Sequence, residues 1–506
     1  MDFSEGIKHL CGPRFINFSF LITMNKDQPV VSLNPDLKAE IHRVFALQKE
    51  HQWEVGRTNA RQRIAKLKRL HQTILEYRLP LEKALWADLR KSPAEVNISE
   101  LGVVLHEIRF AIDHLASWMT PKRVGASLPL FRSHNEIQYE PKGVCLIIAP
   151  WNFPFNLSFD PMVSAIAAGN CVILKPSEFS PNTNVVIREI LDKCFPPGEV
   201  SMFEGDASVA QELLSLPFNH IFFTGSTSVG KVVMRAAAEH LSSVTLELGG
   251  KSPVIVDKTA DLDTAAAKIA WLKVINAGQT CIAPDYVIVH EDCYDKLLEK
   301  LRYHLKAFYG STPEEVKSSP DICRIVGSRH FQRVKYLLDD ALEQGATLEY
   351  GGESDFLDLY IAPTILSGVP ETAKIWEEEI FGPIMPIRTY KHTAEAIAYI
   401  NARPKPLSMY FFSNSDREIR HMLAETRCGG VTVNDCGPHF YNPELPFGGS
   451  NASGLGNCHG EFGFLEFTNS KGVLYQAKYL PVSKFFLPPY GGKLRNLLLE
   501  GLVKWF

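Results

Sequence analysis

The pattern of apolar and polar positions divides the chain into a helical N-terminal region and two regions in which strands and helices alternate. Residues 36–119 are rich in Glu, Lys, Arg and Leu, and long stretches lack Gly and Pro, which predicts mostly helical structure. From residue 142 onward, short continuous apolar runs such as 143–149 and 171–174 alternate with longer amphipathic stretches. Such runs are typical of parallel strands buried on both faces, so the sequence predicts a doubly wound α/β sheet over residues 141–248.

The second half of the chain repeats this alternation and predicts a second α/β domain over residues 249–429. The expected strands are 253–256, 286–289, 359–365, 383–390 and 408–412. The expected helices are 262–276, 293–308, 330–344 and 393–401.

Three segments fall outside these predicted domains. Residues 127–140 are extended and polar, which favours a hairpin or arm, and the Gly-rich segment 430–480 is typical of an excursion onto a partner subunit. Residues 1–23 lack the small-residue cleavage pattern of a secretory signal, and we interpret them as an N-terminal extension. Residues 481–506 form a C-terminal extension that ends in a short apolar helix.

Composition is that of an ordinary globular protein. The chain has 53 Lys and Arg against 57 Asp and Glu. It therefore lacks the excess of basic residues that is typical of a nucleic-acid binder. No apolar run reaches the roughly 18 residues that a membrane-spanning helix needs. The ten cysteines contain no CxxC pair and no zinc-type spacing, so we expect no disulfide scaffold and no metal site, and a reducing cytoplasm fits.

Polar residues follow the first two predicted strands of the 141–248 region. Asn152 lies just after the first strand, and Lys175 and Glu178 end the second. Ligands bind beyond the carboxyl ends of parallel strands, where an Asn amide could stabilise an oxyanion and a Lys–Glu pair could contact ribose hydroxyls. Taken singly, these segments are equally explained by a helix cap and a surface turn.

A glycine-containing turn joins a later strand to a helix. Gly225 and Gly230 would let the backbone approach a diphosphate at the helix N-terminus, with Ser226 between them. The segment matches neither the dinucleotide fingerprint nor the P-loop, because Val232 stands where the P-loop has Ser or Thr.

Two further residues are candidates for acid–base and nucleophilic chemistry. Glu247 lies in an apolar strand between Leu246 and Leu248, where an unpaired carboxylate is costly, so it is a candidate general base. Cys281 follows a Gly-containing break after a helix, where a thiol can face a cleft, but as a nucleophile it needs an electropositive setting. By itself, a structural cysteine is the simpler interpretation.

Seven motifs together give the sequence a family resemblance. They are P-W-N-F-P (150–154), K-P-S-E (175–178), F-T-G-S-T-x-V-G (223–230), L-E-L-G-G-K-S-P (246–253), G-Q-T-C (278–281), E-E-I-F-G-P (378–383) and P-F-G-G (446–449). In this order they resemble the aldehyde dehydrogenase superfamily over nearly all of residues 35–480. The segment 279–286 and the C-terminal extension resemble its class 3, fatty-aldehyde-type branch.

The resemblance implies a fold and domain boundaries. The fold would be α/β, with a Rossmann-type NAD(P)-binding domain from residues 24–126 and 141–248 and a catalytic α/β domain from 249–429. Residues 127–140 and 430–480 would form a β oligomerisation arm of a homodimer.

The resemblance also implies a mechanism for oxidising an aldehyde to a carboxylic acid. Cys281 would form a thiohemiacetal and then a thioester, Asn152 and the Cys281 backbone N–H would form the oxyanion hole, and Glu247 would activate the hydrolytic water. The cofactor would be NAD, with NADP as the alternative. It would contact Trp151, Lys175, Glu178, Gly225, Ser226, Gly230, Glu379 and Phe381.

The C-terminal helix and the remaining alternatives complete the sequence-based predictions. Leucines around 494–502 make the C-terminal helix apolar, and basic residues flank it. This pattern favours packing on a subunit, with peripheral membrane contact as the alternative. We expect a cytoplasmic protein, with membrane association at the periphery as the alternative location. We expect a medium- or long-chain aliphatic or an aromatic aldehyde as substrate. The competing hypotheses are a non-catalytic binding protein and a cofactor-independent cysteine hydrolase or acyltransferase, and both predict no reduction of NAD(P).

Overall fold

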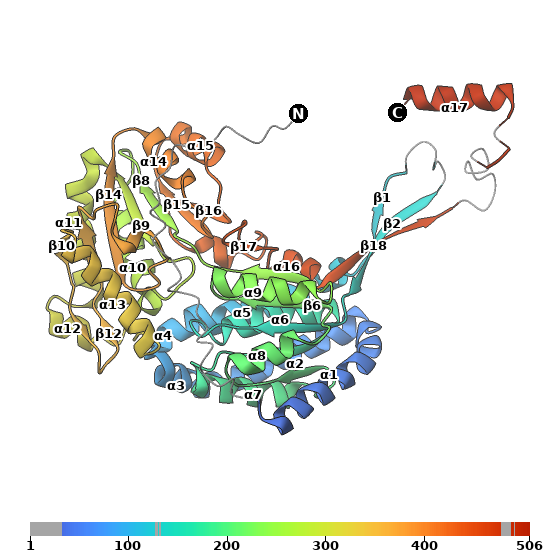
Figure 1. The fold of residues 1–506 in the computed structure, drawn as a ribbon, viewed down its shortest axis with the longest axis horizontal. Coiled ribbons are helices and arrows are strands. Elements are labelled where there is room, and N and C mark those ends of the chain that lie inside the picture. The colour runs from blue at the N-terminus through green and yellow to red at the C-terminus, as the bar shows by residue number, and fades with distance from the viewer. Residues whose placement is uncertain (1–32, 127–129, 131–132, 477–486, 490, 506) are drawn as a thin grey trace, which may run out of the picture.

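A computed structural model describes residues 33–126, 130, 133–476, 487–489 and 491–505, and Figure 1 shows its architecture. The predicted helical region forms α1 (Pro35–Gly56), α2 (Ala60–Glu76), α3 (Arg78–Leu89), α4 (Pro93–Val96) and α5 (Gly102–Trp118). Side chains that accept backbone N–H groups start these helices: Asn34 caps α1, Asn59 forms a capping box with Gln62 on α2, and Ser92 caps α4. One turn of π-helix, Asn97–Leu101, links α4 to α5.

A six-stranded sheet forms the first α/β unit. Its strands are β3 (Val144–Ile148), β4 (Cys171–Lys175), β5 (Val200–Met202), β6 (His220–Thr224), β7 (Ser243–Glu247) and β17 (Gly454–Leu455). The spatial order is β17-β7-β6-β3-β4-β5, parallel except for β17. The crossover helices are α6 (Asn156–Ala168), α7 (Pro181–Cys194), α8 (Ala207–Leu214) and α9 (Thr227–Ala238). The order in which strands are added reverses between β3 and β6, and a doubly wound sheet binds ligands beyond the carboxyl ends of the two strands at such a point.

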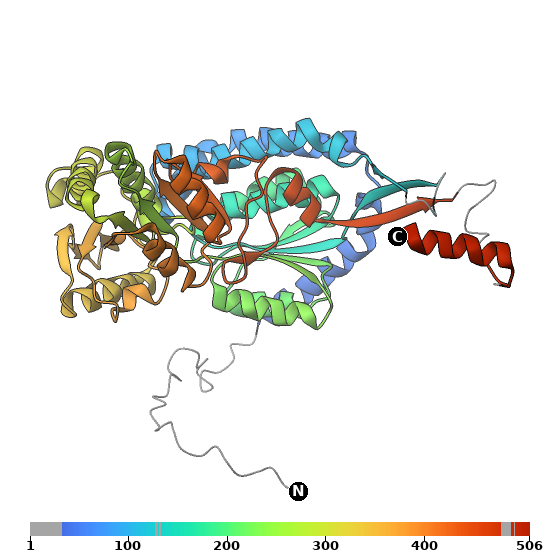
Figure 2. The same cartoon turned by 90° about the horizontal axis from the view of Figure 1, so that it is seen from above.

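The second α/β unit is built on a seven-stranded sheet. Its order is β10 (Thr347–Tyr350), β13 (Thr364–Ser367), β14 (Ile384–Tyr390), β9 (Tyr286–His290), β8 (Pro253–Val256), β15 (Ser408–Phe412) and β16 (Gly430–Val433), with only β10 antiparallel. The accompanying helices include α10 (Leu262–Val274), α11 (Tyr294–Tyr309), α13 (Ser328–Glu343), α14 (Thr393–Asn401) and α15 (Asp416–Glu425). Figure 2 shows the two units side by side.

A three-stranded antiparallel arm extends from the six-stranded unit (Figures 1 and 2). It consists of β1 (Lys122–Val124), β2 (His134–Pro141) and β18 (Thr468–Tyr475). The predicted arm segment 430–480 is therefore too long at its start. Strand β16 pairs with β15, β17 pairs with β7, and α16 (Gly460–Glu466) packs on α5 and α6. These short Gly-rich elements complete both sheets instead of leaving the body of the molecule.

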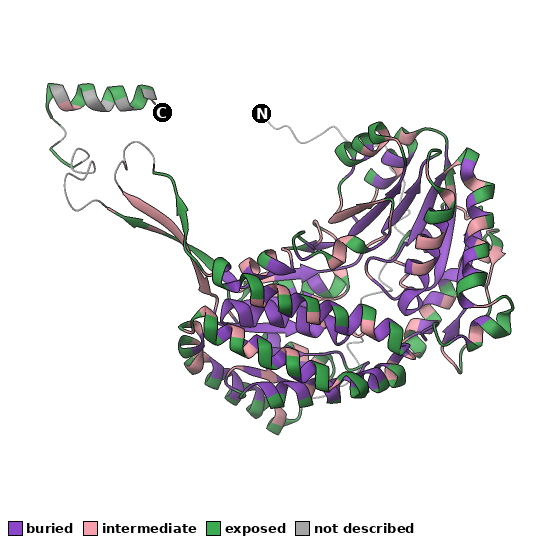
Figure 3. Ribbon diagram, turned by 180° about the vertical axis from the view of Figure 1, so that it is seen from behind, coloured by how far each residue is buried: buried purple, intermediate pink, exposed green. Residues whose placement is uncertain are grey.

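Buried side chains fill the two units, whereas the arm strands are only partly covered (Figure 3). The C-terminal helix α17 (Lys493–Trp505) lies beyond the end of the arm. Leu497 and Val503 on it are exposed. Among the described residues, no helix combines the length and the apolar character needed to cross a membrane. The predicted extension 1–23 lies outside the described residues.

Candidate active site

The loop that carries Cys281 has an unusual backbone. Helix α10 was predicted to run to residue 276 but ends at Val274. Asn276, Ala277 and Gly278 all take positive φ, at 50°, 53° and 72°. Positive φ is disfavoured for residues with side chains such as Asn276 and Ala277, so the surroundings must hold this backbone conformation in place. The turn directs Cys281, which is half-buried, towards an apolar pocket.

Replacing Gly278 with Ala is expected to destabilise the protein. A Cβ at this position would collide with the carbonyl oxygen of Gly382, and the positive φ adds backbone strain. We expect a loss of about 2 kcal/mol or more in the free energy of unfolding, measured by urea denaturation. Gly472→Ala is the matched control, because a Cβ there meets no atom within 4 Å. Equal unfolding midpoints for the two variants would contradict the prediction.

Buried polar contacts hold this loop in place. Glu95 Oε1 accepts the Asn276 backbone N–H at 2.8 Å. The Gln279 amide donates to the carbonyls of Asn276 and Arg324 at 2.9 and 3.0 Å, and its Oε1 accepts the Val326 N–H at 3.0 Å. These contacts satisfy the backbone groups that the strained turn leaves without secondary-structure partners.

Asn152 follows β3 and lies against the same loop. Its Nδ2 donates to the Gln279 carbonyl at 3.1 Å. This bond holds the Asn152 side-chain amide against a residue that lies two positions before Cys281 in the chain. Its own carbonyl accepts hydrogen bonds from Asn276 Nδ2 at 2.7 Å and from Lys91 Nζ at 3.1 Å. The structure therefore brings the two predicted residues Asn152 and Cys281 to one place.

The support behind Asn152 was not predicted from the sequence. Lys91 and Glu100 are fully buried, and their side chains pair at 2.6 Å. Glu100 Oε2 also accepts the Asn156 backbone N–H at 2.9 Å. A buried ion pair needs such additional hydrogen bonds to offset desolvation. The functional signal in the sequence was weak, because charged residues in a helical region are usually solvated.

Glu247 ends β7 and is buried, opposite Gly454 of β17. Within the described part of the chain, neither carboxylate oxygen has a hydrogen bond of standard geometry. Burial raises the pKa of Glu247 well above its ordinary value, while the positive charge of His459 opposes this rise and the carboxylate of Glu466 adds to it. A buried carboxyl with a raised pKa and no fixed partner has the properties of a general base.

The Cys281 thiol is a poor nucleophile in this environment. Burial, with a smaller contribution from the carboxylates of Glu379 and Glu247, raises its pKa to about 12. The backbone N–H groups of Cys281 and Ile282 oppose this rise by hydrogen bonding to the sulfur. Since the thiolate is the attacking form, the site needs a further positive charge or a base to activate it.

The predicted cofactor residues gather at the carboxyl edge of the six-stranded sheet. Lys175 ends β4, and its Nζ donates to Glu178 Oε2 at 3.0 Å. Gly225 follows β6, and Ser226 caps α9. Gly230 lets α9 approach the sheet, since a Cβ there would lie 2.8 Å from Leu248. A helix N-terminus beside the point where the strand order reverses suits a diphosphate.

The remaining predicted cofactor residues come from the second unit and from the turn after β3. The Glu379 carboxylate lies directly against Gly249, where any Cβ would collide with it. Burial raises the pKa of Glu379 to about 8. Phe381 and Trp151 make an edge-to-face contact with ring centroids 5.5 Å apart. Donors and acceptors for a diphosphate and for ribose hydroxyls are therefore present along one edge, and they fit a dinucleotide.

The pocket beside Cys281 is mainly apolar. Its wall is formed by side chains from the helical region, α6, the end of α10 and the segment 440–441. They include Phe153, Leu157, Leu272, Ile275, Ile282, Phe440 and Tyr441, with Ser99, Asn156 and Thr280 as polar members. Such a wall can hold the apolar part of a small molecule whose reactive carbon meets the thiol.

Among the described residues, Glu107, Asp160 and His459 are the one group of three His, Cys, Asp or Glu side chains with donor atoms close enough to share a metal ion. His459 forms an ion pair with each of the two carboxylates. None of the three was singled out from the sequence, where they lie far apart.

Comparison with known proteins identifies the chain. The model of the aldehyde dehydrogenase family matches residues 24–473. The chain is 44% identical to 4,4'-diaponeurosporen-aldehyde dehydrogenase of Staphylococcus aureus over 85% of this chain and 92% of that protein. It is 43% identical to aldehyde dehydrogenase family 3 member A2 of Rattus norvegicus, over 84% and 87%.

Two further comparisons extend this result. The chain is 43% identical to the dimeric NADP-preferring aldehyde dehydrogenase of Mus musculus, over 87% of this chain and 96% of that protein. The solved structure of the substrate-bound state of Staphylococcus aureus AldH superposes with a TM-score of 0.86 at 42% identity, covering 91% of this chain and 99% of that one. The fold predicted from the sequence is confirmed, and the chain belongs to the aldehyde dehydrogenase family.

Proposed function

We propose that this NAD(P)-dependent aldehyde dehydrogenase oxidises apolar aldehydes through a thioester on Cys281. The observation that carries the proposal is the meeting of three groups: a thiol at the pocket, the Asn152 amide on the same loop, and the Glu247 carboxyl close enough to act on the thiol's charge. Such a set supplies a nucleophile, an oxyanion donor and a base.

The residues of the chain act in two stages. Cys281 sulfur bonds to the aldehyde carbon, and the developing oxyanion is stabilised by Asn152 Nδ2 and the Cys281 backbone N–H. When bound, NAD(P)+ accepts a hydride and its positive charge favours the thiolate. Glu247 then takes a proton from the water that attacks the thioester carbon, and Cys281 leaves as the thiolate.

Cofactor binding is assigned to the edge of the six-stranded sheet. Gly225, Ser226 and Gly230 hold the diphosphate, and Lys175 with Glu178 contacts the adenosine ribose. Glu379 and Phe381 bind the nicotinamide riboside, with Trp151 beside Phe381. The support for these roles is the common location of the residues, the Phe381–Trp151 contact and the half-buried Glu379 carboxyl, which accepts the Gly250 backbone N–H.

The substrate class follows from the pocket wall. Seven apolar or aromatic side chains line it, which favours medium- or long-chain aliphatic or aromatic aldehydes over small polar ones. The related Staphylococcus aureus protein is named 4,4'-diaponeurosporen-aldehyde dehydrogenase, which agrees with an aldehyde substrate. Steady-state kinetics with short, medium, long and aromatic aldehydes, each with NAD+ and NADP+, tests it. A higher kcat/KM for acetaldehyde than for octanal would contradict it.

Glu178 is expected to favour NAD+ over NADP+. Its carboxylate is part-exposed beside Lys175 and would repel a 2′-phosphate on the ribose. Glu178→Gln should lower the ratio of kcat/KM for NAD+ to that for NADP+ by about 10-fold, roughly the effect of removing one nearby like charge. Glu204→Gln, on an exposed ion pair with Arg188, is the control. An unchanged ratio in Glu178→Gln would remove the residue from the ribose site.

The arm and α17 are assigned to contacts outside the subunit. The arm strands extend from the body with partly covered side chains, as expected of a homodimer contact. Exposed Leu497 and Val503 on α17 lie near Lys493 and Lys504, a pattern that suits either the dimer mate or a peripheral membrane contact. Light scattering tests the dimer, and flotation with anionic vesicles tests the membrane contact.

A further inference from the structure

A buried charged cluster with no role in the steps above includes His459, the residue that follows Cys458, and the Cys458 thiol contacts the Glu247 carboxyl. His459 Nδ1 is 3.3 Å from Asp160 Oδ2 and 3.7 Å from Glu107 Oε2, and all three side chains are buried. Glu107 comes from α5, Asp160 from α6, and His459 directly precedes α16. Three helices thus converge on one imidazole.

The backbone of His459 is strained. Its φ of 71° and ψ of 142° are rarely adopted by a residue with a side chain. The next N–H, of Gly460, donates to Glu107 Oε1 at 2.7 Å, and the His459 ring packs edge-on against Phe440 with centroids 4.9 Å apart. Strain of this kind persists where the surroundings over-determine the conformation, and it concentrates at functional sites.

The surroundings keep the His459 imidazole charged. Burial alone lowers its pKa, but the carboxylates of Asp160, Glu107 and Glu247 outweigh this effect and raise it. Burial raises the pKa of Asp160, which His459 opposes. Burial, together with the charge of His459, lowers the pKa of His439 in the turn Pro438–Tyr441 to about 4, so this neighbour is neutral. The second ring nitrogen, Nε2, has no hydrogen-bond partner among the described residues.

His459 acts directly on the charge of Glu247. Both Glu247 oxygens are buried, and among the described residues neither has a standard hydrogen bond. The His459 cation and the Glu466 carboxylate are the charges that affect the Glu247 carboxyl, and the Cys458 thiol is a weaker favourable contact. The imidazolium lowers the pKa of Glu247, and Glu466 raises it. Without His459, burial and Glu466 would both favour the protonated carboxyl, which cannot take a proton from water.

We propose that His459, fixed between Asp160 and Glu107, is a positioning residue that stabilises the carboxylate form of Glu247 for thioester hydrolysis. The proposal rests on the assignment of Glu247 as the base. In that step the water oxygen bonds to the thioester carbon and its proton passes to Glu247. The carbon–sulfur bond breaks, and its electron pair stays on Cys281 sulfur. His459 favours the return of Glu247 to the carboxylate once the proton leaves.

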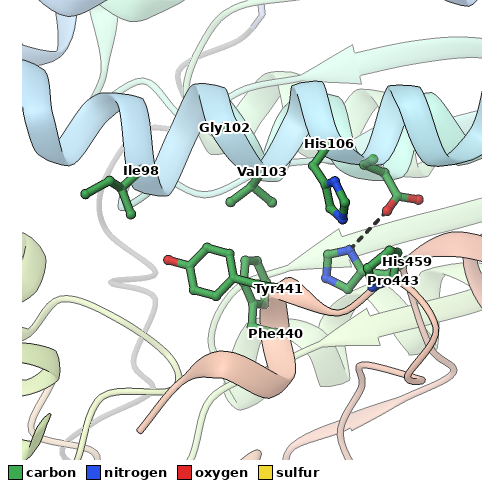
Figure 4. Close-up of a pocket in the computed structure, with 9 residues that line it drawn as sticks. Ile98, Gly102, Val103, His106, Phe440, Tyr441, Pro443 and His459 are labelled. Carbon is green, nitrogen blue, oxygen red and sulfur yellow. Dashed lines mark ion pairs between the residues drawn. The ribbon is translucent and has the colours of Figure 1, made fainter.

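A solvent-connected cavity reaches this cluster. Its volume is about 270 Å³, and His459, Glu107, His106 and Phe440 are among its walls (Figure 4). It is large enough for several waters or for one imidazole molecule. The cavity therefore makes the position of His459 accessible to a small probe.

Decay of the acetyl-enzyme tests the proposal without cofactor. The full-length protein is acetylated at Cys281 with 4-nitrophenyl acetate, and intact mass spectrometry follows the loss of the acetyl group from pH 5 to 10, with Cys281→Ala as the blank. We expect His459→Gly, which suits the positive φ, to slow deacetylation at pH 7 by at least about 10-fold and to move its rise to higher pH. Added imidazole should restore the rate, and His459→Lys should retain more of it than His459→Gln.

The control variants distinguish a failure of the His459 proposal from a failure of the assignment of Glu247 as the base. His106→Gln removes the exposed imidazole of the same cavity and should leave the pH profile unchanged. Glu247→Gln should not deacetylate at any pH, and normal decay in that variant would refute the base assignment itself. If Glu247→Gln stalls while His459→Gly and His459→Gln keep the wild-type profile, His459 has no positioning role. If His459→Gly does not fold, the comparison of Gln with Lys decides in the same way.

Discussion

Cys281→Ala is expected to lower kcat/KM for aldehyde oxidation by at least about 10⁴-fold while leaving the fold and cofactor binding intact. The reason is that the proposed covalent bond to the aldehyde carbon is made by the Cys281 sulfur. Among the described residues that line the apolar pocket, the Thr280 and Ser99 hydroxyls are the other potential nucleophiles, and a hydroxyl is a much weaker nucleophile than a thiol. Reduced cofactor is measured at 340 nm with a preferred aldehyde, and cofactor binding is measured by calorimetry.

The matched control is Cys428→Ser. Cys428 is also part-buried, but it lies before β16 and donates to the Gly430 carbonyl, away from the pocket residues. Serine keeps this donor, so activity should stay within about twofold of wild type, in line with a substitution outside the site. Loss of activity in Cys428→Ser, or more than about 1% residual activity in Cys281→Ala, would contradict the assignment of the nucleophile.

The pH dependence of Cys281 has a defined direction. Because burial raises the pKa of the thiol to about 12 in the protein without ligand, alkylation by iodoacetamide should keep accelerating as the pH rises from 7 to 10. Bound NAD+ adds positive charge to the site and should increase the alkylation rate at pH 7. A rate that levels off below pH 8 without cofactor would show that a cation already activates the thiol.

The strands and their end residues could be predicted because the signals are local. A continuous apolar run such as Val144–Ile148 indicates a buried strand, and the residue that follows it must lie at the sheet edge. Asn152, Lys175 and Glu247 were identified in this way. The grouping of Asn152 and Glu247 around Cys281 required the family resemblance, because spacing along the chain does not say which strand ends meet.

The support of the site could not be predicted, because it depends on contacts between distant segments. Lys91 lies 61 positions from Asn152, whose carbonyl it contacts, and Glu95 lies 181 positions from Asn276. In sequence, these charges belong to a helical region and resemble a solvated surface. The same holds for the segment 430–467, whose glycines indicated an arm although it completes both sheets.

Glu247→Gln should uncouple the first turnover from later ones. Cys281 and the oxyanion donors remain, so one equivalent of reduced cofactor should form in a burst, while steady-state turnover falls by about 10²- to 10⁴-fold because no base activates water. Stopped-flow fluorescence measures the burst, and intact mass spectrometry should detect the thioester. A variant in which no thioester accumulates would refute the role of Glu247.

The pH dependence of turnover adds a second, independent test of Glu247. Only the carboxylate can take the proton, and burial raises the pKa of this group, so the wild-type steady-state rate should fall as the pH drops through that raised pKa. Glu247→Asp keeps a carboxylate at greater distance and should retain this acid limb with a lower maximum. In Glu247→Gln the limb should vanish, leaving the slow rise expected from hydroxide. An acid limb that survives in Glu247→Gln would assign it to another group, and among the charged residues around the site Glu379, with its pKa raised to about 8, would then be the next to mutate.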